Sequence, residues 1–349
     1  MDEGEFATWL EGLARLSGAQ RALAKERLEA PAVLDSEADA GTGPTPAIRR
    51  KRRGAGSGET DALGEVETLK VAGAGCCHCG AFEIAPWGWS HGLRRYRCAD
   101  CRRTFNAATK TPMARLRKRE GWMRQAQALI EGVSLAKAAE RCGVHPTTAF
   151  RWRHRFLTAP ALDKPLALKG IVEADETFIL ESFKGRRSDL PRPARRRGGR
   201  AKHPGLFFEN IPVLVARDRH GATSDAVLPD DPATCVAAGL KDAVTSANQL
   251  ICDGGGAIRA FARRRRIPVH VVPSPGKPDP AAPDMHLNNV NAYHSRLKEW
   301  LRPFHGVATK NLPNYLGWRR AIEAWGDKLT PQNWLLGALG SGPYQQLTL

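Results

Sequence analysis

Apolar residues recur at helical spacing in two stretches of the N-terminal half of the chain. Between residues 5 and 30 this spacing predicts two short amphipathic helices, which could form a docking or dimerising arm or a small helical cap. The next stretch, residues 31–70, is instead rich in Pro, Gly, Ala and Ser and contains a basic cluster at 49–53. That composition predicts a flexible linker between the helical arm and the rest of the chain.

The second helical stretch covers residues 113–160 and predicts a helix-turn-helix. Its first helix ends at Gly132, Ser134 caps the next helix, and Gly143 makes the turn before a third helix that begins at Pro146. In DNA-binding proteins of this kind, residues near the start of the last helix contact bases in the major groove. An ordinary helical hairpin would give the same pattern. The predicted DNA-contacting residues are Thr147, Thr148, Arg151 and Arg155.

From residue 165 the helical period gives way to alternation of apolar and polar residues, which is typical of β-strands. The predicted order is three strands, a helix, a strand, a helix, a strand, a proline-rich loop and a long final helix. This order predicts a ribonuclease-H-like α/β domain with a mixed sheet over residues 165–325. A tail over 326–349 could be a packing cap or a dimer contact. The strands are expected at 171–179, 211–218, 222–228, 249–255 (a strand that ends in a turn) and 267–272, and the helices at 233–244, 257–266 and 287–304.

Four cysteines form two C-x-x-C pairs ahead of the helix-turn-helix. The pair Cys76 and Cys79 is separated by 18 residues from the pair Cys98 and Cys101, a spacing typical of zinc ribbons and knuckles. Each pair can hold a tetrahedral ion from a single turn, so the sequence predicts a zinc ribbon over residues 71–112 with a structural Zn²⁺. A redox-active pair or a chance arrangement is the alternative.

Length, charge and composition narrow the possible functions. At 349 residues the chain is long enough for two or three domains. Its formal net charge of +17 favours a polyanionic partner such as DNA, although a basic surface without such a partner is the alternative. The acidic start lacks the pattern of a secretion signal, and no apolar run approaches the length of a membrane span. We therefore expect a cytoplasmic protein that does not bind a membrane.

Two aspartates occupy positions in the predicted sheet where α/β domains place their active sites. Asp175 lies within the first strand and Asp253 at the end of the fourth. Two carboxylates held close together repel each other, and a divalent cation such as Mg²⁺ removes that repulsion. The final helix has no acid at the obvious position, but Asn291 could supply an amide oxygen, and Lys298, two turns later, could hold a phosphate. For the two aspartates alone, a role in capping or in turns is an equally good interpretation.

Several motifs occur together in one order: CRRTFNAATKTPM after the cysteine pairs, RCGVHPTTAFRWRHRFL, VEADETF, CDGG and HLNNVNAYHSRLK. With these motifs the chain resembles, from about residue 70 to about residue 325, bacterial insertion-sequence transposases of the ISXO type. These are DDE-superfamily enzymes with an N-terminal zinc ribbon. The resemblance implies a triad of Asp, Asp and then Glu or Asn, which holds two Mg²⁺ (or Mn²⁺) ions, and a lysine after it. The matching positions are Asp175, Asp253, Asn291 and Lys298, and His286 and Asn288 match polar residues that precede the third triad member.

The segment 180–210 is expanded and basic. From residue 186 to residue 203 it contains eight Arg or Lys residues and one acid, Asp189, among glycines and prolines. This composition predicts an insertion that tracks DNA and becomes ordered when DNA binds. Its predicted DNA-binding residues are Arg195, Arg196 and Arg197.

The resemblance implies a multidomain protein in which a zinc ribbon and a helix-turn-helix precede a ribonuclease-H-like catalytic domain. The implied function is that of a transposase, which binds the terminal inverted repeats of its element, cleaves there with water and joins the freed 3′-hydroxyl to target DNA. Its partners would be double-stranded DNA and further copies of the chain, because strand transfer joins two ends. The alternatives are a DNA-binding regulator on an inactive catalytic fold and a nuclease that cuts without joining.

Overall fold

The computed structural model describes residues 57–344, except 91, 187, 194–198, 200, 202–208, 229–231 and 273–279, and leaves out the side chains of 57–62 and 232–235. All described residues belong to one compact unit that begins at Ala55. The predicted helical arm and the predicted DNA-binding residues Arg195, Arg196 and Arg197 therefore lie outside the described residues, as does the linker before residue 57.

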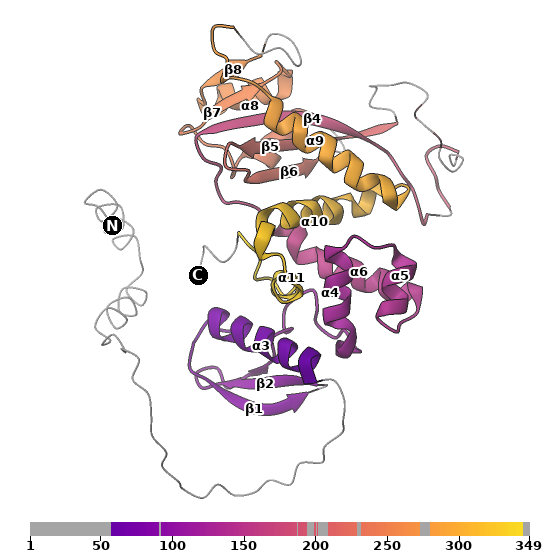
Figure 1. The fold of residues 1–349 in the computed structure, drawn as a ribbon. Helices are drawn as coiled ribbons and strands as arrows, with labels where there is room; N and C mark the ends of the chain where they lie inside the picture. The colour runs from indigo at the N-terminus through magenta and orange to yellow at the C-terminus, as the bar shows by residue number, and fades with distance from the viewer. Residues whose placement is uncertain are drawn as a thin grey trace, which may run out of the picture. The chain divides into compact units, whose positions relative to one another are not determined.

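The cysteine pairs lie in a small module made of one helix and a three-stranded antiparallel sheet (Figure 1). The helix precedes the first pair, and the second pair begins at the last residue of the central strand. The sheet has the order β1-β2-β3, with β1 at one edge. These elements are α3 (Ser57–Ala74), β1 (Ile84–Ser90), β2 (Leu93–Cys98) and β3 (Thr104–Phe105).

Helix α3 replaces part of the predicted linker. The sequence predicted a flexible segment up to residue 70, and this is wrong for residues 57–70, which are helical. The buried side chains of Val66 and Val71 pack in one core with Leu93 and Phe105 from the sheet. Packing of this kind, rather than the helix propensity of the segment itself, stabilises most helices in proteins, and composition does not reveal it.

The predicted helix-turn-helix is present. Ser134 Oγ accepts a hydrogen bond from the Lys137 N–H at 3.4 Å, as a helix N-cap does. Gly132 and Gly143 have φ values of 63° and 61°, a left-handed conformation that glycine adopts without strain. The three helices are α4 (Trp122–Ile130), α5 (Leu135–Arg141) and α6 (Pro146–Leu162), preceded by the short helix η1 (Arg119–Gly121).

The C-terminal half of the chain is built on a five-stranded mixed sheet with the order β6-β5-β4-β7-β8. Strand β5 pairs antiparallel with both β4 and β6, whereas β7 pairs parallel with both β4 and β8. The predicted fold class is confirmed, including the mixed sheet and the order of its elements. The strands are β4 (Ile171–Leu180), β5 (Asn210–Asp218), β6 (Thr223–Val227), β7 (Gln249–Cys252) and β8 (Val269–Val271).

Helices cover both faces of this sheet. On one face, α7 (Pro232–Leu240) and α8 (Gly256–Arg265) share a core with the inward side chains of β4, such as Val172 and Ala174. On the other face, α9 (Asn288–Leu301) packs over β5 and β7. Neighbouring residues of β4 point to opposite faces, so Glu173 and Asp175 lie on the α9 side.

The last helices return to the helix-turn-helix. Trp318, from α10, donates a hydrogen bond through Nε1 to the carbonyl of Leu129 in α4 at 3.1 Å. Gly317 allows α10 to touch α6, because an added Cβ would lie 2.4 Å from the backbone of Ala161. The described part of the predicted tail is thus a packing element, with Trp334 in the same core. The elements after α9 are η2 (Arg302–Phe304), η3 (Thr309–Asn311), α10 (Leu312–Trp325), η4 (Gly326–Lys328) and α11 (Pro331–Ala338).

Candidate metal centres and nucleic-acid interface

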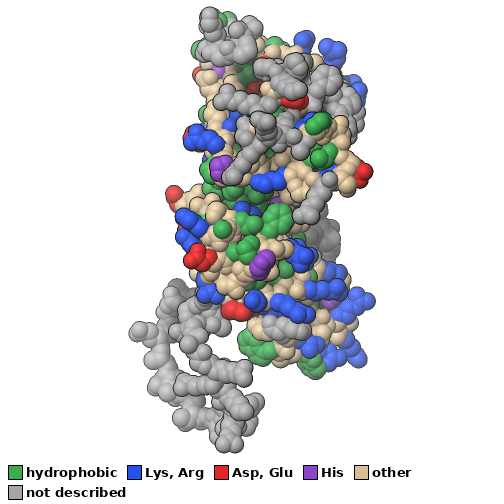
Figure 2. All heavy atoms as spheres, turned by 90° about the vertical axis from the view of Figure 1, so that its right-hand side faces the viewer, with side chains coloured by type: hydrophobic (Ala, Val, Ile, Leu, Met, Phe, Trp, Pro, Cys, Tyr) green, Lys and Arg blue, Asp and Glu red, His purple; other side chains and the backbone are tan. Residues whose placement is uncertain are grey.

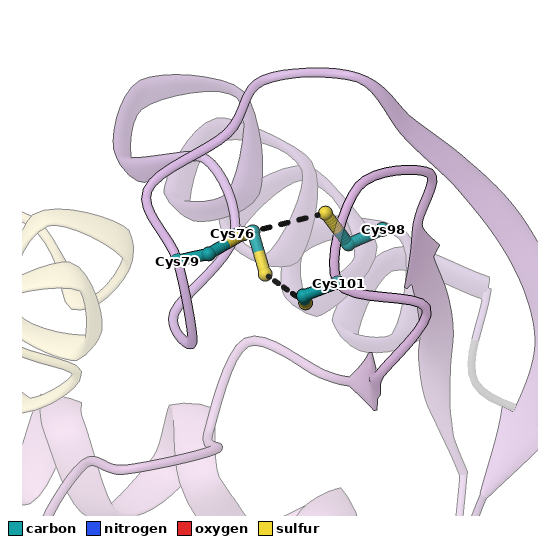
Figure 3. A group of neighbouring side chains, drawn as sticks. All are labelled: Cys76, Cys79, Cys98 and Cys101. Atoms are coloured by element: carbon teal, nitrogen blue, oxygen red, sulfur yellow. Dashed lines mark hydrogen bonds between the residues drawn. The ribbon is translucent and has the colours of Figure 1, made fainter.

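The four predicted zinc ligands converge between two turns (Figure 3). The Sγ–Sγ distance is 3.7 Å between Cys76 and Cys101 and 3.6 Å between Cys79 and Cys98. All four sulfur atoms lie within 4.8 Å of one another. Sulfur atoms around one tetrahedral Zn²⁺ lie about 3.8 Å apart, because the Zn–S distance is about 2.3 Å. The cluster therefore has the size and the donor set of a structural zinc site.

The two cysteine turns share one backbone design. In each turn the N–H of the first cysteine, Cys76 or Cys98, donates to the carbonyl five residues later, at 2.8 Å and 3.1 Å respectively. The residue after the second cysteine is left-handed in both turns, with φ of 80° at Gly80 and 56° at Arg102. Burial opposes ionisation of Cys76, but hydrogen bonds from nearby N–H groups and thiols outweigh it and lower the pKa of Cys76 to about 7.

Three carboxylates form a second cluster beside the strands β4 and β7. The parallel register pairs Glu173 with Ile251, so two residues further along Asp175 lies beside Asp253, just past the end of β7. One oxygen each from Asp175, Glu176 and Asp253 lies within 4.8 Å of the others. The structure thus brings together the two predicted aspartates and adds Glu176, which the sequence analysis did not single out.

The environment of these carboxylates disfavours their ionisation. Burial, and after it the charge of Asp253, raises the pKa of Asp175 to about 6. Burial and the charges of both aspartates raise the pKa of Glu176 to about 7. A Cβ at Gly255 would lie 3.3 Å from Asp253 Oδ1 and 3.7 Å from Glu176 Oε2, so glycine keeps the space beside these oxygens open. An all-oxygen donor set whose charges repel one another fits Mg²⁺ or Mn²⁺.

One face of α9 approaches the acidic cluster. His294 Nδ1 lies 3.8 Å from Asp175 Oδ2, and burial, followed by the charge of Lys298, lowers the pKa of His294 to about 4. The charge of Lys298 also acts on Asp175, where it partly opposes the rise in pKa that burial and Asp253 cause. Asn291 precedes His294 by three residues and therefore lies on the same face of the helix. Within the described residues, its side-chain amide forms no hydrogen bond.

Glu173 ties the start of α9 to β4. Its side chain is fully buried, and Oε2 accepts a hydrogen bond from the Val290 N–H at 2.8 Å. Its other oxygen, Oε1, lies 3.2 Å from Arg219 Nη2 and 3.6 Å from His286 Nδ1. Glu173 is on the same face of β4 as Asp175. Its hydrogen bond to Val290 therefore holds the start of α9, which carries Asn291, in a defined position beside the acidic cluster.

The predicted DNA-contacting residues of α6 differ in their surroundings. Thr147 and Arg151 are exposed, and Thr148 is half-buried. Arg155 is also exposed, and it donates hydrogen bonds to the carbonyls of Pro112 and Ala114, the latter at 2.7 Å. Arg155 therefore holds the segment that joins the zinc module to the helix-turn-helix, a role that its position in the sequence did not indicate.

Sequence reasoning missed three residues around the acidic cluster. Glu176 follows Asp175 directly, and adjacent residues of a strand point to opposite faces, so the pattern gave no reason to join them. Glu173 and His294 have their roles only because β4 and α9 pack together. The one available signal was the concentration of three acids in the motif VEADETF, in a strand that is otherwise apolar or uncharged.

Comparisons with known proteins agree with this architecture. A family model described as ISXO2-like transposase domain matches residues 167–319, and one described as Homeodomain-like domain matches residues 113–162. The chain is 31% identical over 260 residues to an "Uncharacterized protein in transposable element ISH50" of Halobacterium salinarum. That alignment covers 70% of this chain and 83% of the relative.

Similarities to solved structures are weak. A simian T-cell lymphotropic virus intasome structure gives a TM-score of 0.28 at 10% identity, covering 57% of this chain and 68% of that one. A pre-cleavage Mos1 transpososome gives 0.22 at 16% identity, covering 65% and 79%. Among the described residues, no helix combines the length and the apolar character that a membrane crossing requires.

Proposed function

The chain belongs to the ISXO2-like transposase family, whose function is DNA transposition, and on this premise we propose that its acidic cluster cleaves and joins DNA. The observation that carries the proposal is the convergence of Asp175, Glu176 and Asp253 within 4.8 Å. These carboxylates would hold divalent ions, Mg²⁺ or Mn²⁺, and Asn291 would add its amide oxygen. Such ions supply charge that polarises a phosphodiester and makes a bound water acidic.

The protein's own groups would position the reactants. Lys298 lies near Asp175 and would bind a non-bridging phosphate oxygen, while neutral His294 would keep the Asp175 carboxylate in place. In the first reaction the oxygen of water forms a bond to phosphorus at the element's end, and the 3′-oxygen leaves as a hydroxyl. In the second reaction that 3′-hydroxyl attacks a phosphodiester of target DNA and a target 3′-hydroxyl leaves. Neither reaction needs a covalent enzyme intermediate.

DNA recognition would come from the helix-turn-helix and from the basic insertion between β4 and β5. We propose that Thr147, Thr148, Arg151 and Arg155 contact the terminal inverted repeats. The basic insertion would track DNA through Arg195, Arg196 and Arg197. The Cys76, Cys79, Cys98 and Cys101 cluster would hold a structural Zn²⁺. Joining two ends requires more than one active site, so we expect several copies of the chain to assemble on DNA in the cytoplasm.

Substitution of the aspartates tests this function. Asp175→Ala and Asp253→Ala should reduce cleavage and joining of a labelled end duplex in Mg²⁺ by at least about a thousandfold, because several kcal/mol of transition-state stabilisation is lost. Binding of the end duplex should remain within about twofold of the unaltered protein, since the helix-turn-helix is untouched. The exposed acid Glu299, on α9, gives a matched control, and Glu299→Ala should remain active.

The same assay separates the alternatives. Unaltered cleavage by the Asp175→Ala variant would contradict the assignment of the site. A protein that shifts the end duplex but never nicks it would be a regulator on an inactive fold, and cleavage without a joined product would indicate a nuclease. Asn291→Ala should be nearly inactive, whereas Asn291→Glu should keep part of the activity, because Glu also offers an oxygen ligand. A fully active Asn291→Ala would place the remaining ligand elsewhere.

A further inference from the structure

Two tryptophans of the zinc module are exposed. Trp87 and Trp89, both on β1, are 49% and 68% exposed. The other described tryptophans are partly or fully buried; those in the cores are Trp122, Trp152, Trp318, Trp325 and Trp334. Large aromatic side chains left in water on a small module mark a surface that binds something.

These tryptophans are surrounded by positive charge. Residues 84–98, which form β1, β2 and the turn between them, include three arginines and no Asp or Glu. The guanidinium of Arg97 lies 4.5 Å from the centre of the Trp87 ring, and Arg94 is exposed beside Trp89, its partner in the strand register. Figure 2 shows Lys and Arg side chains gathered around this part of the molecule, with hydrophobic side chains among them.

The backbone of β1 presents these side chains rather than burying them. The strand is at the edge of its sheet, and its register with β2 shifts between Pro86 and Trp89. Gly88, in the shifted segment, has a φ of 80°, which favours glycine. The core of the module is formed by other residues, including Leu93 and Phe105. The hairpin therefore displays two rings that the fold itself does not use.

We propose that the β1–β2 hairpin, through the exposed rings of Trp87 and Trp89 and the neighbouring Arg94 and Arg97, side chains here together called the ribbon face, binds unpaired bases of DNA next to the element's end. An aromatic ring stacks on the flat face of a base, and base faces are accessible only where the strands are not paired. The arginines bind the phosphates of the same strand. A second copy of the ribbon face would carry the same charge and be repelled. The inference rests on the proposed function, since it names a DNA structure that the transposase recognises.

Two forms of one end DNA test the inference: a blunt duplex, and the same duplex with a single-stranded flank of about five nucleotides. Affinities are measured without added divalent ions, so that cleavage plays no part. The protein should bind the flanked DNA at least about tenfold more tightly, given the usual strength of base stacking on aromatic rings. Its tryptophan fluorescence should be quenched more by the flanked DNA than by the blunt duplex.

Variants connect this preference to the two rings. The double variant Trp87→Ala with Trp89→Ala should bind both DNAs equally, at the affinity of the unaltered protein for the blunt duplex. Trp87→Phe with Trp89→Phe should keep most of the preference, because a ring remains. Leu162 and Leu166, 75% and 68% exposed outside the zinc module, give a matched control: their removal to Ala takes away exposed apolar surface and should leave the preference intact. Zinc content, measured for every variant, shows that the module is folded.

Each other outcome overturns the inference. It fails if the unaltered protein shows no preference, or if the double alanine variant keeps the preference. Equal weakening of binding to both DNAs would mean that the ribbon face contacts the duplex. Unchanged DNA binding with loss of self-association in sedimentation would mean that it contacts another protein chain. If neither DNA is bound at all, the proposed function fails as well, which separates that failure from a failure of the ribbon face alone.

Discussion

The two candidate metal sites of this chain are built in opposite ways. The cysteine cluster takes all its ligands from two turns between residues 76 and 101. The acidic cluster combines β4, the residue after β7 and one face of α9, which are far apart in the sequence. The first site can form whenever one short segment folds, whereas the second exists only after the sheet and α9 have packed.

The sites also differ in their relation to stability. The cysteine module has a short sheet, and its buried residues share one core with the helix-turn-helix. Metal binding would contribute much of the free energy that folds its two cysteine turns, as it does in other zinc modules. The acidic cluster lies on a sheet with a hydrophobic core on each face. That fold holds repelling carboxylates together without needing the metal. Removing a ligand side chain should therefore destabilise the cysteine module, whereas in the acidic cluster it should reduce the repulsion between carboxylates.

The largest effect is expected from Cys98→Ser. Cys98 is fully buried, and the loss of one of four thiolates should abolish Zn²⁺ binding, which in zinc modules contributes on the order of 10 kcal/mol to folding. We expect amide hydrogen exchange to become fast throughout β1–β3 while β4–β7 keep their protection. Zinc content and exchange measured on the same sample check both statements.

The neighbouring thiol provides the control for this experiment. Cys77→Ser removes a half-buried cysteine outside the quartet and should leave one Zn²⁺ bound per chain. Two results would contradict the proposed difference between the two sites. One is loss of zinc in the Cys77→Ser protein, and the other is slow amide exchange in β1–β3 of a zinc-free Cys98→Ser protein.

An intermediate effect is expected from Glu176→Gln. The substitution removes one charge from the acidic cluster, so Mn²⁺ affinity measured by titration calorimetry should fall by about tenfold or more. Without metal, the same variant should unfold at a slightly higher temperature, because Asp175 and Asp253 lose a repelling neighbour. Glu299→Gln, on exposed α9 surface, should change neither quantity. A metal-free Glu176→Gln protein that is less stable than the original would show that Glu176 supports the fold.

The smallest effect is a dependence of metal-free stability on pH. The pKa values of Asp175 and Glu176 are raised in the folded protein to about 6 and about 7. Acids with raised pKa values stabilise the folded state while they are protonated, below their unfolded pKa values of about 4. This contribution disappears as the pH rises through about 6–7, at a cost on the order of 1–2 kcal/mol once solvent screening is allowed for. Chemical denaturation at several pH values should show that loss, and Mg²⁺ should reverse it. If the unfolding free energy of the Glu176→Gln protein fell with pH as steeply as that of the unaltered protein, Glu176 would not be a source of the pH dependence.

Local patterns predicted much of the molecule. Ser134, Gly143 and Pro146 defined the helices of the helix-turn-helix, because capping and turn chemistry act within a few residues. The succession of strands and helices along the chain followed from alternation and helical spacing. The four cysteines were visible from spacing alone, since both of their turns are closed by hydrogen bonds within five residues.

Features that depend on packing between elements far apart in the chain could not be predicted from the sequence. Helix α3 resembles a linker in composition and is stabilised by contacts with the sheet. Arg155, a predicted DNA contact, also binds the carbonyl of Ala114, a partner that its position in the sequence did not indicate. Glu176 was hidden by the alternation rule, although its carboxylate is long enough to reach the aspartates from the next position on β4. In each case the deciding partner lies on another element.

The packing of α10 and α11 against the helix-turn-helix has a consequence for synthesis of the protein. A ribosome makes α4 and α6 long before Trp318 and Trp334, yet these two tryptophans fill the same core. A product cut short before α10 would leave that core open to water and to proteases. Only a chain that includes α10 and α11 would have a well-packed helix-turn-helix, so every copy with a complete helix-turn-helix would also contain the sheet and its acidic cluster.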